Sequence, residues 1–374
     1  MLRRAHYRRG SGAMVRRTEA QGRVEGGGTT TSIEGPPKRV SIRDVARAAG
    51  VAPSTVSRAF SFPRRVNQTT RLHIERTAAE LGYQRVHVEP QAHRKHAVAV
   101  LVSDVTNPFY FGIIRGTQHQ LAAAGWMQLL VDTEESASSE LQALNAIADR
   151  ADGAVISASR LSDQRLAEIA HRLPLVVVNR KPEGVPSVLI DTPGGMEQAI
   201  QHLVSLGHRD ILYVAGPDGS WSDKRRFGAL HAASKALGLT LTRIGPNVPT
   251  VDSGAAAADA ALNTTATACI AFNDLLAIGM LERFRERGVR VPEDMSVVGC
   301  DDIFGAAFCH PSLTTLTSPI EQAGRVAIRA LLHLIETGVS ATPADDQEDS
   351  ALSHSIVLAT HLTVRESTGP RPQR

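Results

Sequence analysis

The chain has 374 residues, 42% hydrophobic and 21% charged, which is ordinary for a globular protein of about two or three domains. No run approaches the ~20 consecutive apolar residues that a membrane-spanning helix requires, which excludes an integral membrane protein of that kind. Cys269, Cys300 and Cys309 form no CxxC pair. We interpret them as reduced, buried thiols of a cytoplasmic protein.

Charge is distributed unevenly along the chain. Residues 1–96 hold 19 of the 41 lysines and arginines but 7 of the 38 aspartates and glutamates, so the remainder is net acidic. A basic end joined to an acidic body indicates that the first part contacts a polyanion. Residues 1–38 contain few apolar groups and no apolar signal sequence, and we expect them to form a disordered basic tail.

A first helix is predicted directly after this tail. Its apolar positions recur at helical spacing, at Ile42, Val45, Ala46 and Ala49. Ser41 is placed to cap the helix, with Asp44 completing a short capping box. Gly50 supplies the positive φ of the tight turn that follows.

Two more helices complete this unit. Pro53 suits the first position of the second helix, because that position needs no N–H donor. Its inward residues are Val56, Ala59 and Phe60. Asn67 is placed to cap a third helix whose inward residues are Ile74, Ala78 and Leu81. Residues 39–83 therefore predict an all-α helix-turn-helix headpiece.

The second helix presents a small polar outward face. It consists of Ser54, Thr55, Ser57 and Arg58. Short hydroxyl side chains approach phosphates without steric cost, and an arginine fork pairs with guanine O6 and N7. A bare three-helix unit is structural about as often as it binds DNA, but the basic charge and this face favour DNA.

The run from Ser41 to Arg58, with Ala79-Glu-Leu-Gly-Tyr83 further on, resembles the headpiece of the lac repressor family. The resemblance implies that the second helix enters the major groove of double-stranded DNA. The implied base-facing positions are Pro53, Ser54 and Arg58, and the implied phosphate contacts are Thr55 and Ser57.

Residues 84–96 are the expected hinge, and here the chain departs from the family pattern. Arg85 stands where many members have a proline, and Ala92 where they have the leucine that wedges into the minor groove. Pro90 interrupts the segment, and an interior proline costs a helix roughly 3 kcal/mol. We predict a hinge without a wedge, in which Arg85, Arg94 and Lys95 contact phosphates.

From Ala97 the pattern changes to short aliphatic strands alternating with helices. The strand-like runs lie at residues 98–102, 129–131, 154–156, 175–178, 211–215, 269–272 and 297–299. This rhythm predicts parallel sheets covered by helices on both faces. The length indicates two lobes within residues 97–366, followed by a tail at 367–374.

An α/β chain also invites an enzyme interpretation. The sequence contains no GxGxxG after a strand, no GxxxxGK[ST], no GxSxG and no HExxH. His202, His208 and His310 are expected at surfaces or helix caps rather than on a metal. We therefore predict no catalytic residues, no metal and no cofactor.

The family resemblance continues through this region in short motifs that follow one another in order. They include Asn107-Pro-Phe-Tyr110, Ala151-Asp-Gly-Ala-Val155, Leu206-Gly-His-Arg209, Ala271-Phe-Asn-Asp274 and Val291-Pro-Glu-Asp-Met-Ser-Val-Val-Gly299. The resemblance implies the α/β fold of type I periplasmic binding proteins, with two Rossmann-like lobes, three crossovers and an effector in the cleft between them.

The resemblance also implies which residues bind the effector. They are Phe109 and Tyr110 from the first lobe, and Trp221, Arg225, Asn273 and Asp301 from the second. Carboxylates, guanidinium groups and aromatic faces suit a sugar-like ligand. Alternatives stay open: Trp221 as a core anchor, Asp301 as a helix cap and Arg225 as a surface ion-pair partner. Asn179 and Asp191 are weaker candidates.

The sequence thus predicts a cytoplasmic transcription regulator, with repression the favoured sign. It would bind a double-stranded operator as a homodimer, because one helix reads few base pairs and paired half-sites add affinity. A small sugar or sugar derivative would modulate that binding. The alternatives are a sugar-binding receptor, which the headpiece opposes, and an α/β enzyme, which the missing motifs oppose.

Overall fold

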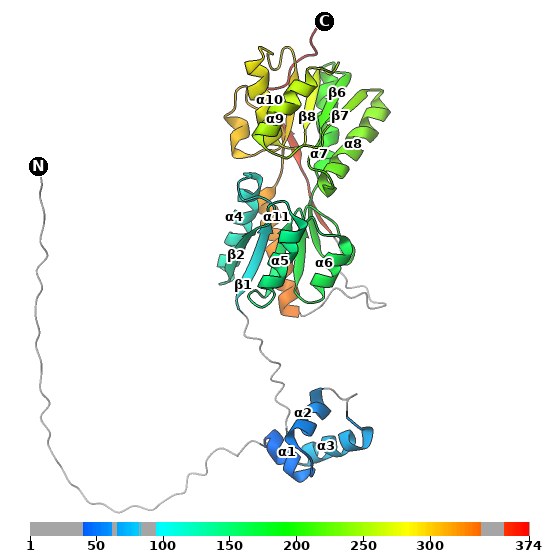
Figure 1. Cartoon of the computed structure of the whole chain (residues 1–374), viewed down its shortest axis with the longest axis vertical. Coiled ribbons are helices and arrows are strands. Elements are labelled where there is room, and N and C mark those ends of the chain that lie inside the picture. The colour runs from blue at the N-terminus through cyan, green and yellow to red at the C-terminus, as the bar shows by residue number, and fades with distance from the viewer. Residues whose placement is uncertain (1–39, 62–65, 82, 84–94, 338–354, 374) are drawn as a thin grey trace, which may run out of the picture. The chain divides into compact units, whose positions relative to one another are not determined.

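The computed structural model describes residues 40–61, 66–81, 83, 95–337 and 355–373, except the side chains of residues 57, 58, 60 and 61. The chain forms two compact units, which divide between Pro90 and Gln91 (Figure 1). The expected tail at 1–38 and the predicted hinge contacts of Arg85 and Arg94 lie outside the described residues. Ala92, where we predict no minor-groove wedge, also lies outside them.

The first unit consists of α1 (Ile42–Ala48), α2 (Pro53–Ser61) and α3 (Gln68–Glu80). Ser41 and Asp44 form the predicted capping box at the start of α1. Gly50 adopts a φ of +63°, which closes the turn into α2. Asn67 Oδ1 accepts a hydrogen bond of 2.9 Å from the Thr69 N–H and caps α3. These local predictions are confirmed.

The headpiece core is small and apolar. Its buried members are Val45, Ala46, Ala49, Val56, Ala59, Ile74 and Ala78. Two predicted core positions are wrong, because Ile42 and Leu81 are exposed. Ile42 opens α1 and Leu81 forms the C-cap of α3, so both lie at helix ends beyond the packed face. Tyr83 packs against the core instead.

The second unit has two lobes, each built on a six-stranded sheet (Figure 1). The first sheet has the order β11-β5-β4-β3-β1-β2, and the second has β12-β10-β9-β8-β6-β7. The strands of the first are β1 (Ala97–Val102), β2 (Met127–Asp132), β3 (Gly153–Ser157), β4 (Leu175–Val178), β5 (Ser187–Ile190) and β11 (Ile356–Leu358). Those of the second are β6 (Asp210–Val214), β7 (Thr240–Ile244), β8 (Ala268–Ala271), β9 (Ser296–Asp301), β10 (Thr314–Thr317) and β12 (His361–Thr363).

All strand pairs are parallel except β10 with β12, so the predicted fold class is confirmed. The first lobe carries α4 (Phe109–Ala123), α5 (Ala137–Ile147), α6 (Asp163–Ala170) and α11 (Ile320–Thr337). The second carries α7 (Thr192–Ser205), α8 (Trp221–Leu237), α9 (Val251–Ala261), α10 (Asp274–Glu286) and the short 3-10 helix η2 (Phe304–Ala307). The chain passes between the lobes after β5, after β10 and after β11.

The C-terminal segment is not a tail over its whole length. Ser367 is fully buried, and its hydroxyl donates a 2.6 Å hydrogen bond to the Val297 carbonyl. The buried His208 donates from Nε2 to the Gly369 carbonyl over 3.0 Å. The expected surface or cap position of His208 is therefore wrong, and the expected tail does not begin at residue 367, because Ser367 and Gly369 are packed into the fold. Backbone pairing of Val297 N–H with Ser367 O continues the fold past the last strand.

Glycines allow α4 and α11 to pack backbone to backbone. A Cβ atom on Gly116 would lie 2.1 Å from the Glu321 carbonyl oxygen, far inside van der Waals contact. Gly324, on the facing helix, would place a Cβ atom 2.6 Å from the Ile113 carbonyl oxygen. This pair of helices fixes the outer face of the first lobe, and the first turn of α4 leads to the cleft.

We expect Gly116→Ala to lower the free energy of unfolding by about 1–3 kcal/mol, because the helices must move apart. The matched control is Gly228→Ala in α8, where no atom lies within 4 Å of an added Cβ. The control should gain roughly 0.5–1 kcal/mol from helix propensity. Urea unfolding followed by Trp126 and Trp221 fluorescence measures both. Wild-type stability of Gly116→Ala would contradict the tight helix contact.

Candidate functional site

A cavity lies between the two lobes, at the carboxyl ends of their strands. Its volume is about 50 Å³, and it is partly open to solvent. The first lobe contributes Asn107, Phe109, Tyr110, Glu135, Arg160 and Asn179. The second contributes Ser220, Ser222, Arg226, Phe272, Asn273 and Asp301. Parallel α/β sheets commonly place ligand sites at this edge, because loops of different strands converge there.

Phe109 and Tyr110 form the aromatic part of the first lobe's wall. They open α4, where Asn107 Oδ1 accepts a 3.0 Å hydrogen bond from the Phe109 N–H. Their ring centroids are 5.1 Å apart in an edge-to-face contact. Burial raises the pKa of Tyr110 well above its usual range, so its phenol stays protonated. Both predicted positions thus line the cavity.

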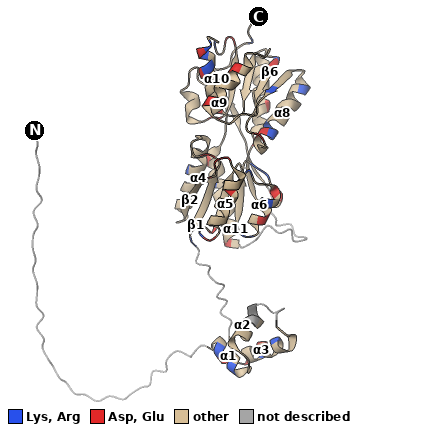
Figure 2. Cartoon of the chain, in the orientation of Figure 1, with Lys and Arg blue, Asp and Glu red and all other residues tan. Residues whose placement is uncertain are grey.

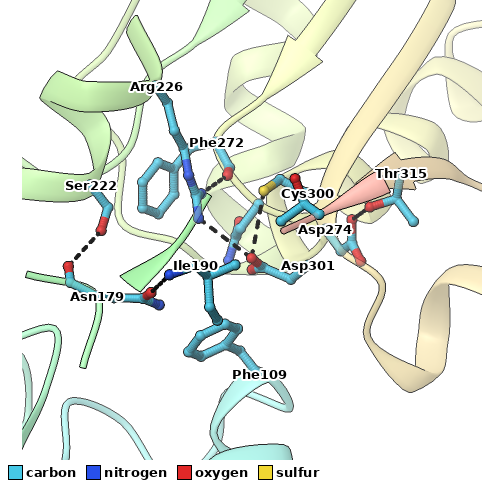
Figure 3. A network of polar contacts seen from close by, with 12 residues as sticks. Phe109, Asn179, Ile190, Ser222, Arg226, Phe272, Asp274, Cys300, Asp301 and Thr315 are labelled. Atoms are coloured by element: carbon cyan, nitrogen blue, oxygen red, sulfur yellow. Dashed lines mark hydrogen bonds and ion pairs between the residues drawn. The ribbon is translucent and has the colours of Figure 1, made fainter. Parts of the chain in front are cut away.

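Arg226 is the charged centre of the second lobe's wall (Figure 3). Its side chain is 5% exposed, and Nη2 lies 3.5 Å from Asp301 Oδ1. The guanidinium carbon stands 4.5 Å from the centroid of the Phe272 ring, and Nη1 donates to the Phe272 carbonyl. Arg226 Nε has no hydrogen-bond partner within the part of the chain that the structure describes.

The arginine predicted for this place was Arg225, one residue earlier. The structure leaves Arg225 exposed, with its guanidinium carbon 5.8 Å from the centroid of the Trp221 ring, and neither residue lines the cavity. The buried positions of α8 are Asp223, Arg226, Leu230 and Ser234. They follow helical spacing, so counting along this face would have identified Arg226.

Asparagines connect the strand ends with the neighbouring elements. Asn273 lines the cavity as predicted and caps α10, accepting a 3.1 Å hydrogen bond from the Leu276 N–H. Asn179 Oδ1 accepts from the Ile190 N–H over 3.2 Å. The Asn179 carbonyl accepts from Ser222 Oγ over 3.4 Å, a hydrogen bond between the lobes. The weaker candidate Asp191 caps α7.

Backbone strain is concentrated around this cavity. Six non-glycine residues with positive φ lie at or just after the carboxyl ends of β2, β3, β4 and β9. They are Glu134, Glu135, Ala158, Asn179, Asp301 and Asp302. Such conformations cost about 1–3 kcal/mol each and are typical of functional sites. The strain directs the side chains at the strand ends to positions that regular strands do not offer.

Sequence reasoning missed one ion pair in the first lobe. Arg160 Nε lies 2.9 Å from Glu135 Oε2, and both residues line the cavity. They follow β3 and β2, which are separated by β1 in the sheet. A search of the residues just after each predicted strand would have found them. Phe272 also lines the cavity and directly follows β8, whereas the predicted strand at 269–272 included it.

Asp274 lies behind Asp301 and is completely buried. It accepts hydrogen bonds of 2.5 Å from Thr315 Oγ1 and 2.8 Å from the Ile303 N–H. Burial, and then the charge of Asp301, raises the pKa of Asp274 to about 7. Burial likewise raises the pKa of Asp301 to about 6. Gly299 leaves room for the Asp274 carboxylate, because a Cβ atom at position 299 would lie 2.1 Å from Asp274 Oδ1.

In the headpiece, α2 presents Pro53 and Ser54 to solvent, and Thr55 is partly exposed. The side chains of Ser57 and Arg58 lie outside those that the structure describes. Figure 2 shows basic residues on α1 and α3, which carry Arg43, Arg47, Arg71 and Arg76. The exposed, small face predicted for the second helix is therefore present at its first residues.

The described part of the chain offers neither a metal-binding cluster nor a membrane-spanning helix. Its His, Cys, Asp and Glu side chains form no group of three or more that could hold a metal ion. None of its helices is long and apolar enough to cross a membrane.

Comparison with known proteins decides the family. Residues 41–85 match the family described as bacterial regulatory proteins, lacI family, and residues 200–368 match a periplasmic binding protein-like domain. The repressor CytR of Escherichia coli (strain K12) is 32% identical over 79% of this chain and 90% of its own length. The chain belongs to the lacI family. As a member it is a DNA-binding transcription regulator, which confirms the predicted class.

Other relatives of this lacI-family regulator span nearly its whole length. The regulator CelR of Thermobifida fusca is 33% identical over 88% of this chain and 98% of its own. A solved CelR–cellobiose complex superimposes with a TM-score of 0.64, at 31% identity over 88% of this chain and 100% of that one. The lac repressor dimer bound to operator and the anti-inducer ONPF superimposes with a TM-score of 0.64. It is 26% identical and covers 89% of this chain and 100% of its own.

The raised pKa of Asp274 predicts a pH dependence of stability. Folding raises this pKa from 3.8 to about 7, so the native state binds the proton more tightly than the unfolded chain. Its contribution is complete below pH 3.8 and is lost as the pH rises through about 7. Asp274→Asn removes this contribution. Between pH 5 and 8 the free energy of unfolding should therefore fall less steeply in the variant than in the wild type, by up to about 1.4 kcal/mol per pH unit.

The control for this experiment is Asp259→Asn. The Arg283 and Arg287 side chains hold the pKa of Asp259 at about 2, so its removal should leave the slope between pH 5 and 8 unchanged. Urea unfolding at several pH values, followed by tryptophan fluorescence, gives the slopes. Parallel pH profiles for wild type and Asp274→Asn would show that Asp274 does not titrate in this range.

Proposed function

We propose that this regulator binds a two-fold operator as a homodimer and that a small sugar-like effector, bound between the lobes, modulates its operator affinity. The observation that supports the effector most directly is the cavity, where Arg226, Asp301, Asn273 and Asn179 converge beside aromatic rings. CytR is named a repressor, which supports repression as the sign. CelR was solved with cellobiose, and the lac repressor as a dimer on operator.

The chemistry of the cavity suits a polyol. Asp301 offers carboxylate oxygens to hydroxyl hydrogens, and Arg226 and the asparagine amides offer N–H donors to hydroxyl oxygens. Phe109 and Phe272 present apolar ring surfaces suited to the C–H face of a sugar. We propose this set as the effector contacts, with Tyr110 beside them and with Arg226 in place of Arg225.

Effector binding is proposed to act through the closure of the lobes. The cavity takes residues from both lobes, and the hydrogen bond from Ser222 to Asn179 joins them. A ligand that contacts both walls stabilises one degree of closure over another. It changes operator affinity only by its differential affinity for those two states. The effector strengthens operator binding if it favours the state whose headpiece spacing matches the operator, and weakens it if it favours the other state.

We further infer that the protein is not an enzyme and that it acts in the cytoplasm. Its curated relatives are named as transcription regulators, and its proposed macromolecular partner is chromosomal DNA. No cofactor is part of the proposal. Turnover assays on any sugar that binds would test the first point, because product formation contradicts it.

Base reading is proposed for Pro53, Ser54 and Arg58, and phosphate contact for Thr55 and Ser57. We expect Arg58→Ala to weaken binding to an operator selected in vitro by ~1–3 kcal/mol, because a bidentate guanine contact is lost. Binding to scrambled DNA should weaken much less. Titration of labelled DNA measures both. Arg225→Ala, an equal change of charge at an exposed position of α8, should bind both DNAs as wild type does.

Equal wild-type affinity for selected and scrambled DNA would contradict sequence-specific binding. If Arg58→Ala lost the same affinity for both DNAs, Arg58 would contact phosphate rather than a base.

Adjacent arginines allow a matched test of the effector site. Sugars that stabilise the wild type against heat are identified first. Arg226→Lys should then lower sugar affinity tenfold or more, because lysine keeps the charge but loses the planar fork. Arg225→Lys should change it less than twofold. Operator affinity without sugar should be unchanged in both. Calorimetry measures the sugar affinities. An equal loss of sugar affinity in the two variants would show that Arg225 contributes to effector binding as much as Arg226 does.

A further inference from the structure

The cavity between the lobes is electrically balanced. Its charged lining residues are Glu135, Arg160, Arg226 and Asp301. They form one ion pair in each lobe, because Arg160 pairs with Glu135 and Arg226 pairs with Asp301. The formal charge of the lining is therefore zero, and each cation already has its anion within its own lobe.

These pairs are shielded from solvent. The Arg226 and Asp301 side chains are 5% and 6% exposed, and those of Arg160 and Glu135 are 16% and 28% exposed. An anionic ligand would have to displace a carboxylate from its arginine or lie beside it without a partner. Because these side chains are largely withdrawn from water, either arrangement is unfavourable.

Helix N-termini do not supply the missing positive charge. Helices α5, α6, α8 and α10 begin near the carboxyl ends of strands, where their dipoles would attract an anion. Each carries a carboxylate in its own first turn, namely Glu140, Asp163, Asp223 and Asp274. The first turn of α4 carries none, but the Asn107 side chain already accepts from its Phe109 N–H.

The remaining polar groups of the lining are uncharged. They are the amides of Asn107, Asn179 and Asn273 and the hydroxyls of Tyr110, Ser220 and Ser222. Amides and hydroxyls both donate and accept, as the hydroxyl groups of a ligand do. Buried Arg226 Nε adds a donor without a partner among the described residues. Such a set matches several hydroxyl groups around a ring and offers an anion no unpaired cation.

We propose that the effector is an uncharged, polyhydroxylated ring compound, and that the ion pairs Glu135–Arg160 and Arg226–Asp301 exclude sugar acids and sugar phosphates. The inference rests on the proposed function and narrows it to one class of ligand. Glu135 and Arg160 thereby determine specificity: their mutual neutralisation keeps the first lobe's wall from attracting an anion.

The test compares matched pairs of ligands on the full-length protein. The pairs are D-ribose with D-ribose 5-phosphate, D-glucose with D-glucose 6-phosphate and D-glucuronate, and cellobiose with cellobionate. Thermal stabilisation identifies the binders, and calorimetry at pH 7.5 gives their Kd values. In every pair that binds, the neutral member should bind at least tenfold more tightly.

A variant tests the origin of that preference. Glu135→Gln leaves the Arg160 guanidinium without its carboxylate, so the affinity for the anionic member should rise about tenfold relative to its neutral partner. Glu321→Gln removes the same charge from an ion pair with Arg325 on α11, outside the cavity lining, and should leave the ratio unchanged. Unfolding curves confirm that both variants fold.

The outcomes separate the two proposals. Tighter binding of a sugar phosphate or sugar acid by the wild type overturns the charge argument and leaves sugar-dependent regulation in place. An unchanged ratio in Glu135→Gln overturns the role of the Glu135–Arg160 pair. Binding of no neutral and no anionic member contradicts the sugar-like effector itself.

Discussion

The second lobe is organised around a guanidinium group that has been removed from water. Burying an unpaired charge is costly, so Arg226 requires partners from several elements. Asp301 at the end of β9 supplies the carboxylate, and Phe272 after β8 supplies a carbonyl oxygen and a ring face. This requirement fixes α8 relative to two strand ends. The polar wall of the cleft follows from it (Figure 3).

A second buried group supports the same wall from behind. Asp274 holds the backbone of Ile303 and the side chain of Thr315, and Gly299 leaves it the space. Asp274 is buried, and the charge of nearby Asp301 further disfavours its ionisation. Arg226 pairs with Asp301, whereas Asp274 receives only neutral donors. The difference explains why Asp274 has the higher pKa of the two.

The second unit combines two sheet-based lobes that the described residues join by three chain crossings and by hydrogen bonds such as Ser222–Asn179. Within each lobe, parallel strands and tightly packed helices such as α4 and α11 resist deformation. Between the lobes the chain crosses after β5, β10 and β11, and the Ser222–Asn179 hydrogen bond spans the cleft. A ligand that touches both walls therefore acts on the relative position of the lobes rather than on their interiors.

The family resemblance implied the cavity residues Phe109, Tyr110, Asn273 and Asp301. Local rules in the sequence determined the headpiece, its caps at Ser41 and Asn67 and the α/β class. These follow from nearest-neighbour chemistry and from hydrophobic periodicity, which a single chain displays. Strand β7, at the edge of its sheet, was not predicted because its sequence, Thr-Leu-Thr-Arg-Ile, contains no apolar run. The pairing of Arg226 with Asp301, the pairing of Glu135 with Arg160 and the packed position of Ser367 depend on residues distant in sequence. Only the tertiary structure decided them, because burial and charge pairing are properties of neighbours in space.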